Sequence, residues 1–114
     1  MKKNKIIITG GAGFVGTNLI SKLITNKNYI IYATYYRNKN FKKFKRVKYI
    51  KGNLLILDFC KKITKNIDEV YMCAAFTAGA NIINKNPLKF VYDNTTMNLN
   101  ILKASSKNKV KKFI

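Results

Sequence analysis

Three glycines recur at intervals of three near the N-terminus, where residues 9–16 read T-G-G-A-G-F-V-G. Gly10 follows the β-branched run 6–9 and would let the chain turn sharply off a strand. Gly13 removes a side chain where a pyrophosphate must approach the backbone, and Gly16 lets the following helix pack closely on the sheet. Free N–H groups at the start of that helix would face the phosphates. The spacing therefore predicts the phosphate-binding turn of a dinucleotide site rather than a flexible glycine-rich loop.

Several common kinds of catalytic and metal site are excluded by composition. The sequence contains no histidine, so His-based acid–base chemistry, Ser-His and Cys-His nucleophile pairs, and His-ligated metal sites are ruled out. Cys60 and Cys73 are thirteen positions apart, and two cysteines are too few for a zinc site or a disulfide scaffold. We therefore expect reduced, buried thiols and no metal site.

The chain is strongly basic, with 23 Lys and Arg against 4 Asp and Glu and a formal net charge of +19 over 114 residues. Such a charge favours nucleic-acid binding, and the best patch interleaves Phe41 and Phe44 with five cations: Lys42, Lys43, Lys45, Arg46 and Lys48. The composition offers a second explanation, because Lys (21), Asn (15) and Ile (15) all have A/T-rich codons, whereas Arg occurs only twice. Codon drift would supply most of these lysines, so we expect nucleic acid not to be the main partner.

Strand and helix patterns alternate along the chain. β-Branched and aromatic runs predict strands at residues 6–9, 29–35, 47–50, 70–74 and 110–114. Apolar residues at helical spacing predict a helix at residues 15–24, with Val15 on its apolar face, and a helix from Pro87 onward, with Val91, Met97, Ile101 and Leu102 on one face. A short helix is expected at 58–65, whereas 37–48 reads as a basic loop or frayed helix. This order predicts an α/β fold with a doubly wound parallel sheet, the Rossmann fold, truncated at its fifth strand.

The two ends of the chain suggest its cellular context and its extent. Behind the basic residues 1–5, the apolar run 6–8 is too short for a signal-peptide core or a membrane span, so we expect a cytoplasmic protein without membrane contact. Residues 110–114 read as an apolar strand that no loop or polar tail follows. We therefore expect residues 1–114 to be the N-terminal part of a dinucleotide-binding domain, with the catalytic half and the substrate domain absent from this chain.

Five segments together give the chain a family resemblance. They are the turn at 9–16, Gly52-Asn53-Leu54 and Cys73-Ala74-Ala75 after two predicted strands, the helical segment 93–104 and the strand 110–114. With these motifs the whole chain resembles the extended short-chain dehydrogenase/reductase family of nucleotide-sugar epimerases, dehydratases and reductases. Residues 33–37 and 77–80 are most similar to its GDP-fucose synthase-like branch.

The resemblance implies a role for each matching position. The pyrophosphate would be held by Gly10, Gly13, Phe14 and Val15, the adenine would be flanked by Asn53 and Leu54, and the ribose and nicotinamide side would be walled by Ala74 and Ala75. Asn53 stands where the family usually has Asp, and its amide can still accept a hydrogen bond from the adenine amino group. For Asn94 two interpretations stay open, a functional role and a helix side chain that satisfies buried backbone.

The residues after the second predicted strand bear on the choice of nicotinamide cofactor. NAD selectivity usually comes from a carboxylate about 20 residues past the glycines, which accepts from the ribose hydroxyls. Here the first acid is Asp58, and the expected slot at Tyr35 is followed by Tyr36 and Arg37. A guanidinium binds a 2′-phosphate bidentately, so we predict NADP(H) with Arg37 as the main contact and Lys39 assisting. The alternatives are NAD as cofactor and Arg37 as a solvated loop residue.

No catalytic residue is expected in this chain. The family's Tyr-x-x-x-Lys pair and its Ser or Thr would lie beyond Ile114, and Tyr35 with Lys39 has the right letters at the adenosine end. We expect the longer parent protein to be an NAD(P)-dependent epimerase/dehydratase or oxidoreductase that acts on a nucleotide sugar and forms a homodimer. The alternatives are a basic nucleic-acid-binding protein and a non-catalytic protein that senses the cofactor.

Overall fold

The computed structural model describes residues 2–77 and 79–114. Its strands are β1 (Asn4–Thr9), β2 (Tyr29–Tyr35), β3 (Val47–Lys51), β4 (Glu69–Met72) and β5 (Lys112–Phe113). Its helices are α1 (Phe14–Leu23), α2 (Leu57–Ile63), α3 (Ala80–Lys85) and α4 (Pro87–Lys107). Of the segment 77–80, which carries part of the resemblance, residue 78 lies outside the described residues.

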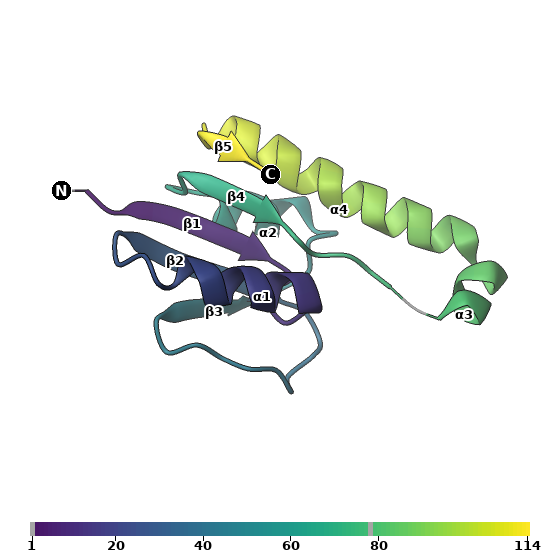
Figure 1. The fold of residues 1–114 in the computed structure, drawn as a ribbon. Helices are drawn as coiled ribbons and strands as arrows, with labels where there is room; N and C mark the ends of the chain where they lie inside the picture. The colour runs from purple at the N-terminus through teal and green to yellow at the C-terminus, as the bar shows by residue number, and fades with distance from the viewer. Residues whose placement is uncertain (1, 78) are drawn as a thin grey trace.

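The strands form one parallel sheet in the order β3-β2-β1-β4-β5 (Figure 1). The chain builds it outward in both directions from β1, which is the doubly wound arrangement predicted from the sequence. Two crossovers, through α1 and through α2, bring the middle strands β1, β2 and β4 side by side. All the carboxyl ends consequently meet at one edge of the sheet.

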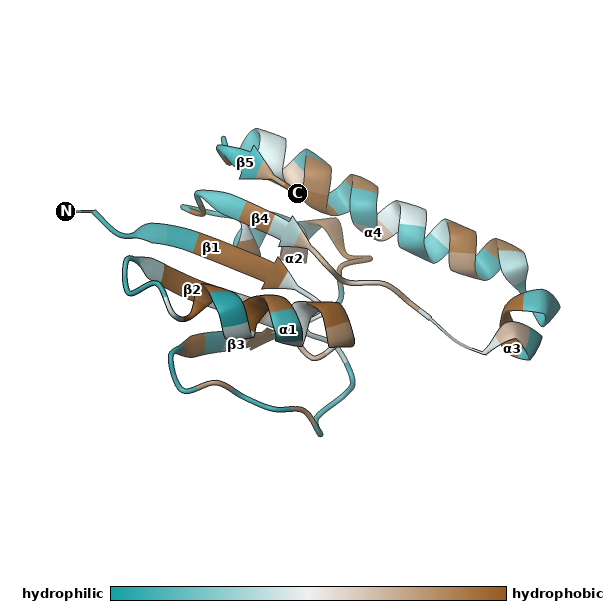
Figure 2. Ribbon diagram, viewed as in Figure 1, coloured by the Kyte–Doolittle hydropathy of each residue, from teal (hydrophilic) through white to brown (hydrophobic). Residues whose placement is uncertain are grey.

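Helices cover both faces of the sheet because successive side chains of a buried strand point to opposite sides. Ile6 and Ile8 pack with Ile20 of α1 on one face, whereas Ile7 packs with the α2 and α4 residues on the other face. Figure 2 shows the apolar residues concentrated toward the carboxyl end of β1, where all three isoleucines are fully buried.

Several boundaries differ from those predicted. The predicted strand 70–74 ends at Met72, and the last strand begins at Lys112 rather than at residue 110. The short helix α3, which the pattern did not predict, precedes α4. On α1, Val15 was expected on the apolar face but is 62% exposed, since it lies in the first turn, beyond the sheet.

α4 begins at Pro87 as predicted, with the proline in its first turn. Met97 and Ile101 are buried against the sheet, but Val91 and Leu102, which were predicted on the same face, are exposed. Figure 1 shows the reason for Val91, since the N-terminal end of α4 extends with α3 beyond the sheet. Leu102 lies about 100° around the helix from the buried Ile101 and so points away from the sheet. Within residues 2–77 and 79–114, no helix combines the length and the apolar character needed to cross a membrane.

Candidate functional site

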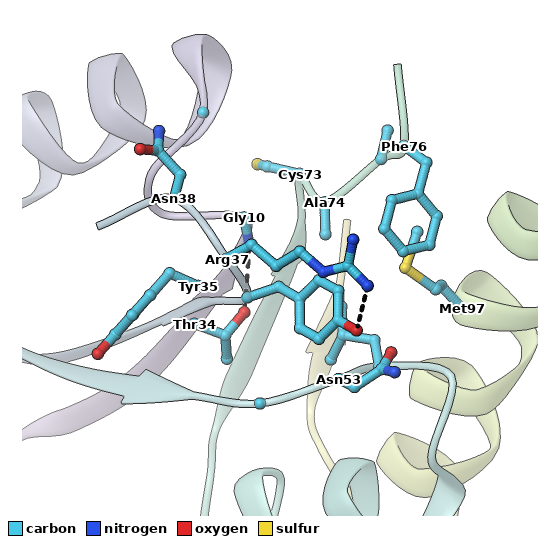
Figure 3. Close-up of a pocket in the computed structure, with 15 residues that line it drawn as sticks. Gly10, Thr34, Tyr35, Arg37, Asn38, Asn53, Cys73, Ala74, Phe76 and Met97 are labelled. Carbon is cyan, nitrogen blue, oxygen red and sulfur yellow. Dashed lines mark hydrogen bonds between the residues drawn. The ribbon is translucent and has the colours of Figure 1, made fainter. Parts of the chain in front are cut away.

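A cavity of about 360 Å³ lies where the carboxyl ends of β1, β2, β3 and β4 converge (Figure 3). In open parallel sheets of this kind, this is the edge at which ligands bind. Eight of the twelve residues predicted to bind a cofactor line it: Gly10, Gly13, Tyr35, Arg37, Asn53, Leu54, Ala74 and Ala75. From the sequence, none of the seven other lining residues was assigned to a cofactor: Thr34, Tyr36, Asn38, Gly52, Cys73, Phe76 and Met97.

Two glycines of the turn are required by the fold itself. Gly10 has φ of +70°, and a Cβ there would lie 2.7 Å from the Cα of Ala74. A Cβ on Gly16 would lie 2.2 Å from the carbonyl oxygen of Gly10. Both positions therefore exclude any side chain, the first through its left-handed backbone and both through close backbone contact.

Gly13 differs from these two glycines. A Cβ there would meet only the carbonyl oxygen of Gly10, at 3.4 Å, and Gly13 has φ of −83°, which any residue adopts. Gly13 is exposed at the rim of the cavity and is the N-cap of α1, with no side-chain cap. The fold alone therefore does not require a glycine at position 13. The absence of a side chain there leaves space open at the rim of the cavity.

The first turn of α1 (residues 14–16) directly follows Gly13 and lies outside the cavity lining. The N–H of Thr17 donates to the carbonyl of Gly13 (2.9 Å), so the N–H groups of residues 14–16 have no acceptor within the helix. Phe14 is 86% exposed, and neither it nor Val15 lines the cavity. Gly16 is buried beneath the turn, again outside the cavity lining. Any role of these residues toward a ligand would rest on their N–H groups.

Thr9, which the sequence reasoning did not single out, joins the ends of β1 and β4. Its hydroxyl oxygen accepts hydrogen bonds from the N–H groups of Cys73 (3.1 Å) and Ala74 (3.2 Å). Thr34 joins the end of β2 to the turn after β1, since its hydroxyl oxygen accepts a hydrogen bond from the N–H of Gly10 at 3.2 Å. These two buried threonines fix the strand ends that carry the cavity walls.

The wall that follows β3 is formed by Asn53 and Leu54. The side-chain carbonyl of Asn53 accepts from the N–H of Leu55 (2.9 Å), a local turn that leaves one lone pair of that oxygen free. Leu54 is 5% exposed, and its backbone carbonyl accepts from the side-chain amide of Asn100 on α4 (3.0 Å). The loop after β3 is thereby held against α4.

Asn94 on α4 holds the opposite wall. Its side-chain oxygen accepts from the N–H of Phe76 (2.8 Å), and its side-chain amide donates to the carbonyl of Phe76 (3.1 Å). Of the two interpretations left open for Asn94, the structure supports the second, in which its side chain satisfies backbone groups. Through this pair of bonds, Phe76 is fixed as a wall of the cavity.

Tyr36 and Arg37 extend from the end of β2 into the cavity lining. Nη2 of Arg37 donates to the hydroxyl oxygen of Tyr36 at 3.2 Å (dashed in Figure 3), and its guanidinium carbon lies 4.8 Å from the centre of the Tyr36 ring. The Tyr36 ring in turn meets the Phe76 ring edge-on at 6.3 Å. Lys39, which we expected to assist Arg37, is exposed and lies outside the cavity lining.

The charge of the cavity lining is positive. Among the described residues that line it, Arg37 is the one charged at neutral pH, and no carboxylate is present. Burial raises the pKa of the Cys73 thiol, so this thiol is neutral there. Across residues 2–77 and 79–114, no three His, Cys, Asp or Glu side chains gather as a metal site would need. The cavity is therefore suited to an anionic ligand.

Comparison with known proteins gives a consistent result. A model of the NAD dependent epimerase/dehydratase family matches residues 6–114. The chain is 31% identical to GDP-mannose 3,5-epimerase 1 of Oryza sativa subsp. indica, over 98% of this chain and 30% of that protein. It therefore spans about 30% of the length of the curated relatives it matches.

Two solved structures add to this comparison. UDP-glucose 4-epimerase of Thermotoga maritima, determined with UDP-glucose, matches with a TM-score of 0.81 and 26% identity, over 96% of this chain and 36% of that one. UDP-glucose 4-epimerase of Bifidobacterium longum, in complex with NAD+ and UDP, matches with a TM-score of 0.79, 26% identity and the same coverage of 96% and 36%. The fold of this chain is thus shared with about a third of each of these enzymes.

Proposed function

This chain belongs to the NAD dependent epimerase/dehydratase family, and on that premise we propose that its cavity binds a nicotinamide dinucleotide, with NADP(H) preferred over NAD(H). The observation that carries the proposal is the open space at Gly13. A glycine there is not needed for packing, and it stands beside uncapped helix N–H groups at the rim of the cavity. Such a position fits a pyrophosphate that must approach the backbone.

The remaining walls would hold the other parts of the dinucleotide. We assign the adenine to Asn53 and Leu54 and the ribose and nicotinamide side to Ala74 and Ala75, all of which line the cavity. The free lone pair of the Asn53 side-chain oxygen is available to the adenine amino group. When bound, the nicotinamide ring supplies a hydride acceptor and donor, while the residues of this chain bind and orient the cofactor.

The preference for NADP(H) rests on Arg37. It lies after β2, at the adenosine end of such a site, and no carboxylate lines the cavity to repel a 2′-phosphate. A guanidinium also offers two parallel donors to a phosphate. Lys39 lies outside the lining, so its part would be limited to long-range attraction.

For the longer protein of which this chain would form the N-terminal part, we propose epimerisation, dehydration or reduction of a nucleotide sugar. Support comes from relatives whose names include GDP-mannose 3,5-epimerase and UDP-glucuronic acid decarboxylase. No residue of this chain is assigned a catalytic role, because Tyr35 and Lys39 lie at the adenosine end. Homodimer formation and a cytoplasmic location stay predictions.

The alternative function, nucleic-acid binding by the basic loop, finds less support. The Nζ atom of Lys43 lies over the rings of Tyr35 (5.8 Å) and Phe41 (5.3 Å), and that of Lys42 lies over Phe44 (5.0 Å). Both Phe rings are also partly buried. Rings that are covered by lysines of the same chain are poorly placed to stack on bases.

Titration of the chain with NADPH and with a DNA oligonucleotide at about 150 mM salt would separate the two functions. We expect saturable NADPH binding and no retention of DNA, because phosphate contacts alone weaken steeply with salt. DNA retention at this salt concentration without NADPH binding would favour the alternative.

A further inference from the structure

Tyr36 contacts Arg37, the residue that we propose binds the 2′-phosphate. The hydroxyl oxygen of Tyr36 accepts from Nη2 of Arg37 at 3.2 Å, and the guanidinium carbon lies 4.8 Å from the ring centre. Both residues line the same cavity, and Figure 3 shows the Arg37 side chain there. The ring and the hydroxyl of Tyr36 therefore both restrain the guanidinium group.

Arg37 has no competing anionic partner in the part of the chain that the structure describes. The ion pairs there join Lys89 to Asp93 and Lys111 to Asp68. Arg37 itself is exposed, and an exposed arginine samples many rotamers unless a neighbour restrains it. The contacts with Tyr36 are thus what restrains the guanidinium group at the cavity lining.

Tyr36 is in turn restrained from its other side. Its ring meets the ring of Phe76 edge-on, at 6.3 Å and an interplanar angle of 70°. The backbone of Phe76 is held by the two hydrogen bonds to Asn94 on α4. The orientation of Arg37 is thereby linked, through two aromatic rings, to the helix on the far side of the cavity.

The hydroxyl of Tyr36 also retains a donor. Because its oxygen accepts from Arg37, its O–H remains free to donate. An O–H donor beside a guanidinium makes a set of donors suited to the oxygens of a phosphate monoester. A ribose 2′-hydroxyl, which is neutral, gains far less from the same donors.

We propose that Tyr36 determines selectivity for NADP(H), by positioning the Arg37 guanidinium and by donating its own hydroxyl proton in a hydrogen bond to the 2′-phosphate. This inference rests on the proposed function, in which the cavity binds a nicotinamide dinucleotide and Arg37 contacts the 2′-phosphate. It adds a second residue, and two separable contributions, to that selectivity.

The test compares the binding constants of NADPH and NADH, measured by calorimetry, for the wild type and the variants Tyr36→Phe, Tyr36→Leu, Arg37→Ala and the double variant Tyr36→Leu/Arg37→Ala. Tyr36→Phe keeps the ring and loses the hydroxyl, whereas Tyr36→Leu loses both. Tyr92→Leu, at an exposed tyrosine of α4 outside the cavity lining, controls for the removal of an aromatic ring. Adenosine 2′,5′-bisphosphate and 5′-AMP repeat the comparison at the adenosine end alone.

We expect Tyr36→Leu to lower the NADPH:NADH affinity ratio about fivefold to tenfold, and Tyr36→Phe to lower it by a smaller factor. In the Arg37→Ala background, Tyr36→Leu should change the ratio by a smaller factor than in the wild type, because the guanidinium that it positions is gone. A merely structural role would weaken both dinucleotides equally, and that result would overturn the inference.

Failure of the inference and failure of the proposed function give different results. If Arg37→Ala lowers the ratio while both Tyr36 variants leave it unchanged, only the role of Tyr36 is refuted. If the wild type binds neither dinucleotide, or if Arg37→Ala leaves the ratio unchanged, the proposed function itself fails and this inference fails with it.

Discussion

The carbonyl oxygen of Gly10 lies so close to Gly16 that a Cβ on Gly16 would come within 2.2 Å of it, whereas a Cβ on Gly13 would approach the same oxygen only to 3.4 Å. The distance to this one oxygen atom thus distinguishes a glycine that packing requires from one that packing does not require. Gly16 is required because α1 passes directly over the end of β1. Gly13 is free of that constraint, and we propose that the approach of a ligand explains its lack of a side chain.

Substitution of Gly16 should therefore mainly lower stability, whereas substitution of Gly13 should mainly weaken ligand binding. We expect Gly16→Ala to destabilise the chain by about 2 kcal/mol or more through overpacking. Gly13→Ala should change stability by less than about 1 kcal/mol but weaken NADPH binding about tenfold or more. Urea denaturation and calorimetric titration of both variants measure the two quantities. Equal loss of stability in both variants would contradict the assignment of Gly13 to a ligand.

Thr9 should be important for stability, because it is fully buried and its hydroxyl oxygen accepts two backbone hydrogen bonds from the residues that follow β4. Thr9→Val would leave the N–H groups of Cys73 and Ala74 without this acceptor, at a cost of about 2 kcal/mol. Thr9→Ser, which keeps the hydroxyl, is the matched control and should retain most of the stability. Comparable urea midpoints for the Val variant and the wild type would show that these bonds are dispensable.

The two cysteines should differ in their reactivity and in their response to ligand. Cys73 lines the cavity and is partly exposed, whereas Cys60 is fully buried and burial raises its pKa from 9.0 to about 11. We expect a thiol reagent at neutral pH to modify Cys73 first, since the Cys60 thiolate is scarce and inaccessible. Saturating NADPH should slow the modification of Cys73 and leave Cys60 unaffected. Modification of Cys73 at the same rate with and without NADPH would place the dinucleotide elsewhere.

Stability should fall at alkaline pH. Burial raises the pKa of Cys60 from 9.0 to about 11, and burial together with the hydrogen bond to Glu69 raises that of Tyr71 from 10.0 to about 12. Because both folded-state pKa values are raised, the stabilisation is complete below the unfolded values of 9.0 and 10.0 and is lost as pH rises toward 11 and 12.

Urea denaturation at about pH 8 and about pH 10.5 tests this pH dependence. Cys60→Ala should reduce the difference in the free energy of unfolding between the two pH values, because one of the two titrating groups is removed. An unchanged difference would mean that the buried thiol does not contribute to it.

Much of the fold could be predicted from the sequence, because its strands are strongly patterned. The aromatic and β-branched run 29–35 predicted β2 with its observed bounds, Tyr29–Tyr35. The strand predicted at 70–74 ends early, at Met72, because Cys73 and Ala74 donate to the side chain of Thr9 rather than to a neighbouring strand. A side-chain acceptor that replaces a strand partner leaves no periodic signal in the sequence.

The last strand was predicted to begin at residue 110, and the difference again has a local cause. Lys109 adopts φ of +56°, and the N–H of Val110 donates to the carbonyl of Ser105 (2.9 Å). This bond caps the C-terminus of α4 in the manner of a Schellman motif. The N–H of Val110 is therefore not available to pair with a neighbouring strand. Lysine rarely adopts this conformation, so its identity did not indicate the cap.

For the candidate site, residues within motifs were easier to predict than residues brought together by tertiary contacts. Local patterns were enough to predict the lining residues of the glycine turn and Asn53, Leu54, Ala74 and Ala75. They also predicted Phe14 and Val15 in the first turn of α1, whose exposed side chains lie outside the cavity lining. Phe76 and Met97 belong to the cavity only because α4 packs behind the sheet, and Tyr36 only because its ring turns toward Phe76. Such contacts have no fixed spacing along the chain.

The central claim is that the cavity binds NADP(H) with Arg37 at the 2′-phosphate, and the affinity ratio of NADPH to NADH tests it most directly. Arg46 is the matched control, because it is the other arginine of the chain and donates to the carbonyl of Ile24, outside the cavity lining. We predict that the wild type and Arg46→Ala favour NADPH to the same degree, and that Arg37→Ala lowers the ratio by about tenfold or more. A ratio that Arg37→Ala leaves unchanged would contradict the claim.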